Sequence, residues 1–173
     1  MSIPFIDLLS QRRRIGATID AALMEVAASG QYIMGPAVGA FEQALCDFGQ
    51  APYALSCSNG TDALVLLMMA WDVGPGDAVF CPAFTFAATA EVVALAGATP
   101  VFVDIRPDTW TMDPDHLRAA VEAVEREGVL KPRAVIAVDL FGQPADYPAL
   151  SDITHKHGLK LIADSAQGFG CTL

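Results

Sequence analysis

Basic residues are scarce in this sequence. The chain of 173 residues has 10 Lys and Arg against 20 Asp and Glu, which gives a formal net charge of -10 at pH 7. A protein with this balance repels nucleic-acid phosphates and anionic membranes, so we expect neither as a partner. Any anionic ligand must therefore be held locally, by a few well-placed groups.

The sequence also lacks the patterns that mark metal sites, secreted proteins and membrane spans. The N-terminus MSIPFIDLLSQRRR has no long apolar run, and the apolar stretch 92–103 contains Gly and Pro and is too short to cross a membrane. The four cysteines show no CxxC spacing, which predicts reduced core thiols and no metal site: Cys46, Cys57, Cys81 and Cys171. We therefore expect a soluble cytoplasmic protein.

The three histidines also match no metal-ligand spacing. They lie in predicted helices, away from the loops that could carry chemistry: His116, His155 and His157. We interpret them as surface histidines or as histidines with satisfied hydrogen bonds.

Hydrophobic periodicity predicts two helices at the start of the chain. Apolar residues recur at helical spacing from Ile15 to Val26, before Gly30, and again from Val38 to Phe48, after Pro36. No repeat or linker-like change in composition interrupts the sequence, so residues 1–173 are expected to form one continuous unit.

After these helices, short apolar runs typical of strands alternate with helical runs. Strands are expected at 53–57, 78–81, 100–104, 134–138 and 159–163, and helices at 61–71, at about 86–96, from Asp113 and from Asp146 to Gly158. Repeated β-α-β units with continuous apolar strands predict an α/β fold, a mostly parallel sheet with helices on both faces. Ligands of such sheets bind beyond the carboxyl ends of the strands, which directs attention to three loops.

The first loop, with the sequence SCSNGTDAL at 56–64, leads from a predicted strand into a helix. The free N–H groups and the positive dipole end of that helix favour a phosphate, and Gly60 allows close approach to the backbone. The loop lacks the GxxxxGK[ST] pattern of a nucleotide P-loop. Taken alone, the motif is explained equally well by capping of the helix by Ser58, Asn59 or Thr61.

The second loop, at 81–89, carries Phe84 and Phe86 among small residues. One ring could stack on a flat ligand, although aromatic residues at strand ends are more often part of the core. The third loop follows an apolar strand that ends on Asp164, a carboxylate that is costly to bury without a partner. A cationic ring nitrogen would be such a partner, with Gln167 hydrogen-bonding a nearby oxygen, and a turn or capping role for Asp164 is the alternative.

Together the three loops offer a phosphate cradle, a stacking surface and a carboxylate at one edge of the sheet. Pyridoxal phosphate (PLP) presents a phosphate, an aromatic ring and a pyridinium nitrogen whose proton must be retained for the ring to act as an electron sink. The three loops therefore predict a PLP site.

At these residues the sequence resembles the DegT/DnrJ/EryC1/StrS family of sugar aminotransferases, which have the type I aminotransferase fold. The motifs SNGTDAL and D-x-A-Q, here within ADSAQGFG, are highly specific in this order and spacing. Further matches complete the resemblance, of which the Gly-Pro and Phe-Val-Asp pieces are weaker: Ile3–Phe5, Gly30–Pro36, Gly76-Asp77 leading to PAFTFAATA, Pro100–Asp104 and Val138–Gly142. The resemblance implies that 1–173 comprise an N-terminal segment and the PLP-binding large domain of a PLP-dependent transferase.

The resemblance implies six cofactor-binding residues: Gly60, Thr61, Asp62, Phe86, Asp164 and Gln167. The backbone amides of Thr61 and Asp62 would hold the phosphate, and the ring of Phe86 would stack on the pyridine. Asp164 would pair with the pyridinium nitrogen, and Gln167 would lie near the ring hydroxyl. Residues 32–36 would lie near the substrate entrance. Family members act as dimers in which both chains contribute to each site, so a homodimer is expected.

In this family a lysine downstream of the D-x-A-Q motif forms a Schiff base and moves protons. The present chain ends shortly after that motif, and its own three lysines are expected on the solvated surface: Lys131, Lys156 and Lys160. We therefore expect the catalytic lysine beyond Leu173, in the rest of a truncated large domain. These 173 residues alone are then expected not to transaminate.

The implied reaction transfers an amino group from an amino acid, usually glutamate, to a keto group of a nucleotide-linked sugar, in glycan or secondary-metabolite biosynthesis. Asp139 stands where many relatives carry His, and Ala163 where many carry Glu, which leaves the substrate open. Two alternatives stay open as well. One is a sugar dehydratase of the same family, with His in place of the lysine. The other is a non-catalytic module that binds PLP or a partner.

Overall fold

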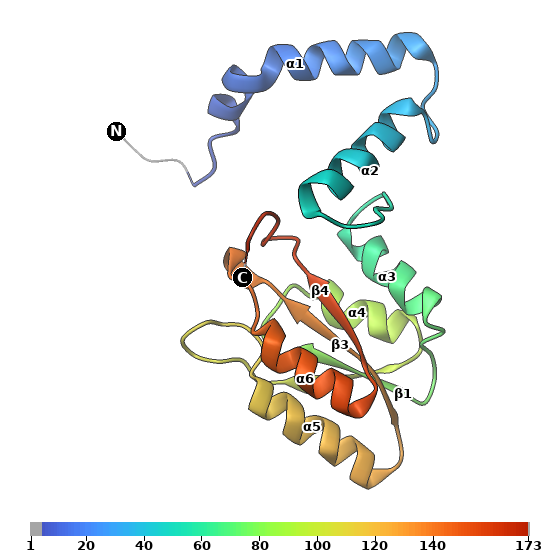
Figure 1. Ribbon diagram of the computed structural model, residues 1–173, viewed down its shortest axis with the longest axis vertical. Helices are drawn as coiled ribbons and strands as arrows, with labels where there is room; N and C mark the ends of the chain where they lie inside the picture. The colour runs from blue at the N-terminus through green and yellow to red at the C-terminus, as the bar shows by residue number, and fades with distance from the viewer. Residues whose placement is uncertain (1–4, 173) are drawn as a thin grey trace. The chain divides into compact units, whose positions relative to one another are not determined.

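The computed structural model describes residues 5–172, which divide into two compact units between Ser56 and Cys57. The first unit contains two helices, and the second contains the sheet with the remaining helices (Figure 1). Ile3 and Pro4, which belong to one of the matches to the family, lie outside the described residues, as does Leu173. The six predicted cofactor residues all belong to the second unit.

The first unit consists of α1 (Leu8–Ser29) and α2 (Pro36–Gly49), as the hydrophobic periodicity predicts. The Asp7 side chain caps α1, and Gly30 ends it with a left-handed φ of 66°. The apolar sides of the two helices are largely exposed, and Phe41, for example, is 56% exposed. The amphipathic pattern is therefore present, while its apolar side stays uncovered within this unit.

The segment 53–57, predicted as a strand, forms none and has no ladder partner among residues 5–172. Tyr53 and Leu55 are 88% and 76% exposed. The end of the segment is held instead by Glu42, whose Oε1 accepts hydrogen bonds from the Ser56 amide at 2.8 Å and from its hydroxyl at 2.7 Å. The prediction is wrong because an apolar run becomes a strand only when a neighbour satisfies its backbone groups.

The second unit is built on a parallel sheet in the order β2-β1-β3-β4. The strands are β1 (Asp77–Pro82), β2 (Thr99–Val103), β3 (Lys131–Val138) and β4 (Lys160–Asp164). All four lie at the predicted positions with shifted ends. Because the strands are parallel, their carboxyl ends meet along one edge, where the predicted loops emerge.

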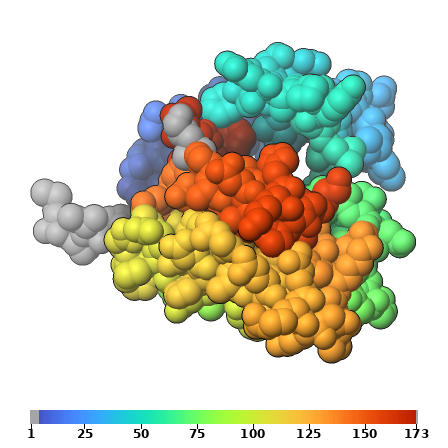
Figure 2. All heavy atoms as spheres, turned by 60° about the horizontal axis from the view of Figure 1, so that its bottom comes forward, coloured from blue at the N-terminus to red at the C-terminus, as the bar shows by residue number. Residues whose placement is uncertain are grey.

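Helices cover both faces of this sheet, as predicted (Figure 1). The helices are α3 (Gly60–Ala70), α4 (Ala88–Leu95), α5 (Pro114–Glu127) and α6 (Tyr147–His157), with a short 3-10 helix, η1 (Leu140–Gly142). The first two pack on one face and the other two on the opposite face, where Figure 2 shows α5 and α6 side by side.

Two separate cores result from the alternation of side chains along each strand. On β1, Val79 packs under α3 and α4 while its neighbour Phe80 packs under α5 and α6, and both are fully buried. On β3, Ile136 and Val135 divide in the same way. The sheet is thus buried on both faces, which leaves its carboxyl-end edge as the place for a ligand.

The capping residues predicted for the last two helices are confirmed. Asp113 accepts a hydrogen bond from the Asp115 amide at 2.8 Å at the start of α5. Asp146 caps α6, which ends at Gly158 with a φ of 66°. These caps fix where each helix leaves the sheet and so fix the loops before them.

The cysteines divide between core and surface. Cys81 is fully buried on β1, and burial raises the pKa of its thiol to about 12. Cys46 is partly buried, whereas Cys57 and Cys171 are exposed, so the prediction of core thiols is wrong for these two. Both lie in loops, where small neighbouring residues reflect turns rather than core packing. Among residues 5–172, no group of three or more His, Cys, Asp and Glu could hold a metal ion.

Of the helices in residues 5–172, none has both the length and the apolar character needed to span a membrane.

Candidate active site

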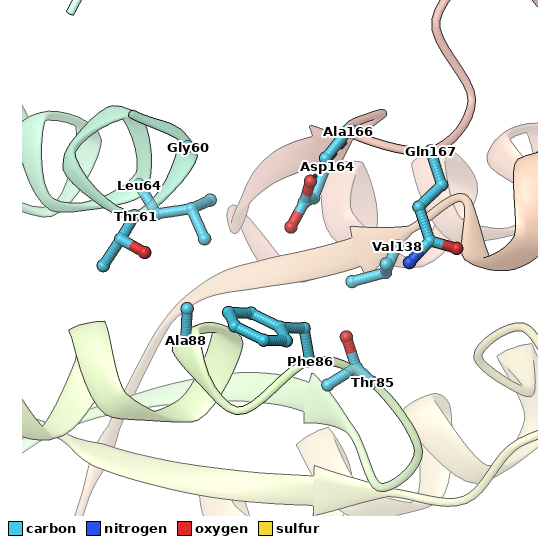
Figure 3. Close-up of a pocket in the computed structure, with 10 residues that line it drawn as sticks. All are labelled: Gly60, Thr61, Leu64, Thr85, Phe86, Ala88, Val138, Asp164, Ala166 and Gln167. Carbon is cyan, nitrogen blue, oxygen red and sulfur yellow. Dashed lines mark hydrogen bonds between the residues drawn. The ribbon is translucent and has the colours of Figure 1, made fainter. Parts of the chain in front are cut away.

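A pocket of about 280 Å³ opens beyond the carboxyl ends of β3 and β4. Residues from the three predicted loops line it together with Val138 at the end of β3 (Figure 3): Gly60, Thr61, Leu64, Thr85, Phe86, Ala88, Val138, Asp164, Ala166 and Gln167. Five of the six predicted cofactor residues are among them, and Asp62 is not. The fold thus brings together residues that lie a hundred positions apart in the sequence.

The N-terminus of α3 forms one wall of this pocket. Asn59 caps the helix, because its Oδ1 accepts a hydrogen bond from the Asp62 amide at 2.9 Å, and the Asp62 carboxylate accepts a hydrogen bond from the Ser58 hydroxyl. The capping alternative is therefore right for Asn59. A phosphate that used the Asp62 amide would have to displace this cap.

Gly60 and Thr61, the first two residues of α3, line the pocket together with Leu64 one turn later. A Cβ built on Gly60 would have no neighbouring atom within 4 Å, so the backbone is open to a ligand there. The positive end of the helix dipole favours an anion at this point.

Phe86 lies across the pocket from Asp164 and is 72% exposed (Figure 3). Phe84 is 46% exposed and packs against Trp110 and Phe141, with ring centroids 5.5 Å and 6.3 Å apart. The expectation that both phenylalanines belong to the core is wrong, because their loop passes beyond the end of β1. The open face of Phe86 can accept a flat ring.

Asp164 ends β4 and is partly buried rather than enclosed. Its Oδ1 accepts a hydrogen bond from the Ala166 amide at 3.2 Å, so the turn role considered as an alternative is also present. Gln167 lines the same side of the pocket, and its Oε1 accepts a hydrogen bond from the Phe141 amide at 2.6 Å. Both side chains therefore face the pocket while the adjoining loops restrain them.

Asp139, which the sequence marked only as a departure from many relatives, is 3% exposed and directly follows Val138, which lines the pocket. Its carboxylate accepts hydrogen bonds from the Ala145 amide, the Tyr147 hydroxyl and the Ser165 hydroxyl, at 3.0, 2.7 and 2.5 Å. Burial and the bond to this carboxylate raise the pKa of the Tyr147 phenol above its usual range. The signal that could have identified Asp139 is its place directly after the buried strand β3, one residue beyond the position that Asp164 holds at the end of β4.

The lysines are exposed, as predicted, and none lines this pocket: Lys131, Lys156 and Lys160. His116 and His155 are also exposed. His157 differs, because only 9% of its side chain is exposed and its Nδ1 lies 2.9 Å from Glu125 Oε1. Its Nε2 is buried with no hydrogen-bond partner in the described part of the chain, so the interpretation as a surface or satisfied histidine is wrong there.

Comparison with known proteins places these features in one family. Residues 13–173 match the model of the DegT/DnrJ/EryC1/StrS aminotransferase family. UDP-2-acetamido-2-deoxy-3-oxo-D-glucuronate aminotransferase of Pseudomonas aeruginosa PAO1 is 49% identical over 98% of this chain, which covers 45% of that relative. The chain thus spans less than half the length of this curated relative.

Solved structures give the same result. A DegT DnrJ EryC1 StrS aminotransferase from Brucella abortus superposes with a TM-score of 0.96 at 49% identity, over 98% of this chain and 45% of that one. NtdA from Bacillus subtilis with bound cofactor PMP superposes with a TM-score of 0.85 at 31% identity, over 99% and 38%. These matches confirm the predicted resemblance and fold class. The aminotransferases of this family depend on PLP, the cofactor that the three loops predict.

Proposed function

Because this chain belongs to the DegT/DnrJ/EryC1/StrS aminotransferase family, we propose that it provides the PLP-binding residues of a nucleotide-sugar aminotransferase. The acceptor would be a keto group of a nucleotide-linked sugar, and the donor an amino acid such as glutamate. The P. aeruginosa relative, whose name specifies a UDP-linked 3-oxo sugar, supports this substrate class. The observation that supports the proposal most strongly is the pocket, which is lined by a helix N-terminus, an open phenyl face and a carboxylate.

The residues present fit the phosphate, the ring and the ring nitrogen of PLP. The open backbone at Gly60 and the dipole of α3 suit a phosphate, although the -10 net charge of the chain is unfavourable to anions. Phe86 offers a flat apolar surface in the middle of the pocket, and Asp164 offers the one carboxylate among its described lining residues.

When bound, PLP supplies an electron sink for the carbon that gains or loses the amino group. Asp164 would keep a proton on the ring nitrogen, because a nearby carboxylate favours the charged form of a cation. Phe86 would fix the plane of the ring and exclude water from one of its faces. Since the Oε1 of Gln167 is engaged by the Phe141 amide, its NH₂ group is oriented to donate a hydrogen bond to a ring oxygen.

The proton-transferring lysine is proposed to lie beyond Leu173, since the described residues that line the pocket include no lysine. We also propose that the enzyme acts as a homodimer in the cytoplasm, and that Tyr32–Pro36 lie near the substrate entrance. Without the downstream lysine, the 173 residues would bind the cofactor only non-covalently and would not transaminate.

A PLP titration followed by absorbance tests the proposal. The chain would be compared with a form extended through any downstream lysine, and borohydride reduction would trap lysine-bound cofactor. The expected result is that both forms bind PLP and only the extended form traps it. Binding without trapping in the extended form would favour the dehydratase instead. Absence of binding in both forms would exclude the proposed cofactor site.

A further inference from the structure

The carboxylate of Asp139 connects the end of β3 to the start of α6 and to the turn after β4. Its Oδ1 accepts hydrogen bonds from the Ala145 amide and the Tyr147 hydroxyl, which lie at the start of α6. Its Oδ2 accepts a hydrogen bond of 2.5 Å from the hydroxyl of Ser165, the residue that directly follows Asp164. All three partners are donors, so the acceptor-only carboxylate satisfies them without conflict.

The backbone repeats this link between the two aspartates. Val138 lies opposite Asp164 in the ladder between β3 and β4, and the next amide, of Asp139, donates to the Asp164 carbonyl at 3.0 Å. This backbone hydrogen bond therefore extends the contact between the two strands by one residue beyond the last pair, Val138 and Asp164. Movement of Asp139 would be transmitted directly to the position of Asp164.

The loop 165–168 also packs directly on Asp139. The Gly168 amide donates to the Ser165 carbonyl at 3.0 Å, which closes a turn over the aspartate. A Cβ built on Gly168 would lie 2.6 Å from the Asp139 Cβ and 2.9 Å from its Oδ2, so only glycine allows this approach. Gln167 sits within the same turn and faces the pocket.

We infer that Asp139 is a positioning residue, whose buried carboxylate holds the turn 165–168 so that Asp164 and Gln167 face the cofactor. The claim about the turn concerns this chain alone, and the claim about the cofactor rests on the proposed PLP function. Asp139 itself does not line the pocket, so it acts through the other two residues. A hydrogen bond to a buried charge is strong enough to select one loop conformation.

The two hydroxyls that bind Asp139 provide a matched test in the full chain. Ser165→Ala removes the link on the side of the site, and Tyr147→Phe removes the link on the side of α6. For Ser165→Ala we expect roughly tenfold weaker PLP binding, the usual effect of one charge-assisted hydrogen bond, and a changed absorbance spectrum of bound PLP. Tyr147→Phe leaves the Ala145 bond to the same carboxylate oxygen, so it should lower the thermal midpoint and change PLP affinity and spectrum much less than Ser165→Ala does.

Two further measurements separate positioning from general stability. Ser165→Thr keeps the hydroxyl and is expected to restore both PLP affinity and spectrum. Amide hydrogen exchange of cofactor-free protein should be faster at residues 165–168 in Ser165→Ala than in the Tyr147→Phe variant. If the two variants lose PLP affinity equally, or if exchange in the turn is unchanged by Ser165→Ala, the inference is wrong.

The exchange measurement also keeps the inference separate from the proposed function. If the wild-type chain bound no PLP, the proposed function would fail. Amide hydrogen exchange at residues 165–168 would still show whether Asp139 restrains the turn. If PLP bound normally and exchange in the turn did not respond, only the positioning claim would fail.

Discussion

The two ends of the sheet differ in how they present positive charge. At the amino end, a cavity of about 350 Å³ is lined by Lys131, Arg133 and Lys160 together with His157. At the carboxyl end, the pocket has no Lys, Arg or His among its described lining residues. Three of the ten Lys and Arg side chains of this acidic protein thus lie at the end opposite the proposed phosphate site.

The cations at the amino end have structural contacts. The Arg133 Nε lies 3.3 Å from Asp77 Oδ2, and its guanidinium donates to the Trp71 carbonyl at 2.5 Å. Lys160 Nζ lies 5.8 Å from the centroid of the Trp71 ring. These contacts tie the starts of β3 and β4 to the end of α3. The proposed anion site therefore follows from strand direction and a helix dipole, and not from a cluster of basic side chains.

The largest effect is expected from neutralising one carboxylate at each end of the sheet. Asp164→Asn should weaken PLP binding by roughly 100-fold, because the ring nitrogen loses a charged partner in a partly enclosed pocket. Asp77→Asn, at the amino end, should leave PLP affinity unchanged and reduce stability through loss of the Arg133 pair. Absorbance titration measures the first effect and urea denaturation the second. An equal loss of PLP affinity in both variants would contradict the assignment of PLP binding to the carboxyl end of the sheet.

Glycines at the two ends are expected to respond differently to alanine. Gly168→Ala should lower the free energy of unfolding by about 2 kcal/mol, because its Cβ would lie 2.6 Å from the Asp139 Cβ and force the backbone to shift. Gly158→Ala meets no atom within 4 Å and is strained only by its φ of 66°, so about 1 kcal/mol is expected. Urea denaturation of both variants checks this order. The reverse order would mean that the turn does not rest on Asp139.

Much of the site could be predicted from the sequence, because a β-α-β order fixes which strand ends share an edge. Gly60 and Asp164 are far apart in the chain, yet each follows or ends an apolar run, and parallel strands bring such positions together. The caps Asp113 and Asp146 could be predicted for a similar reason, since they depend on local sequence alone.

The remaining features depend on contacts that periodicity does not encode. The cap of Asn59 on Asp62 and the bond from Phe141 to Gln167 are set by loop conformation. The segment 53–57 has strand-like composition, but only a neighbouring strand could have made it part of a sheet. The place of Asp139 after a buried strand marks it as a candidate, but its three donors, one of them from Ser165 after β4, could not be derived from the sequence.

A smaller effect is expected from Arg133→Met, which keeps much of the apolar stem. Loss of the Asp77 pair and of the bond to the Trp71 carbonyl should cost about 1 kcal/mol, since 30% of the Arg133 side chain is exposed and solvent screens the pair. PLP affinity should not change. A clear loss of affinity with unchanged stability would mean that the amino end contributes to anion binding.

The smallest effect is expected from Lys160→Met. The contact of this lysine with the Trp71 ring at 5.8 Å is solvent-exposed, so its loss should cost about 0.5 kcal/mol, measurable as a small shift in the urea midpoint. Lys156→Met, on exposed α6 surface, is the matched control and removes the same charge. Because both variants change the net charge equally, long-range attraction of PLP phosphate would alter its affinity in both to the same small extent. A loss of PLP affinity confined to Lys160→Met would instead assign the phosphate to the amino end and reverse the contrast between the two ends of the sheet.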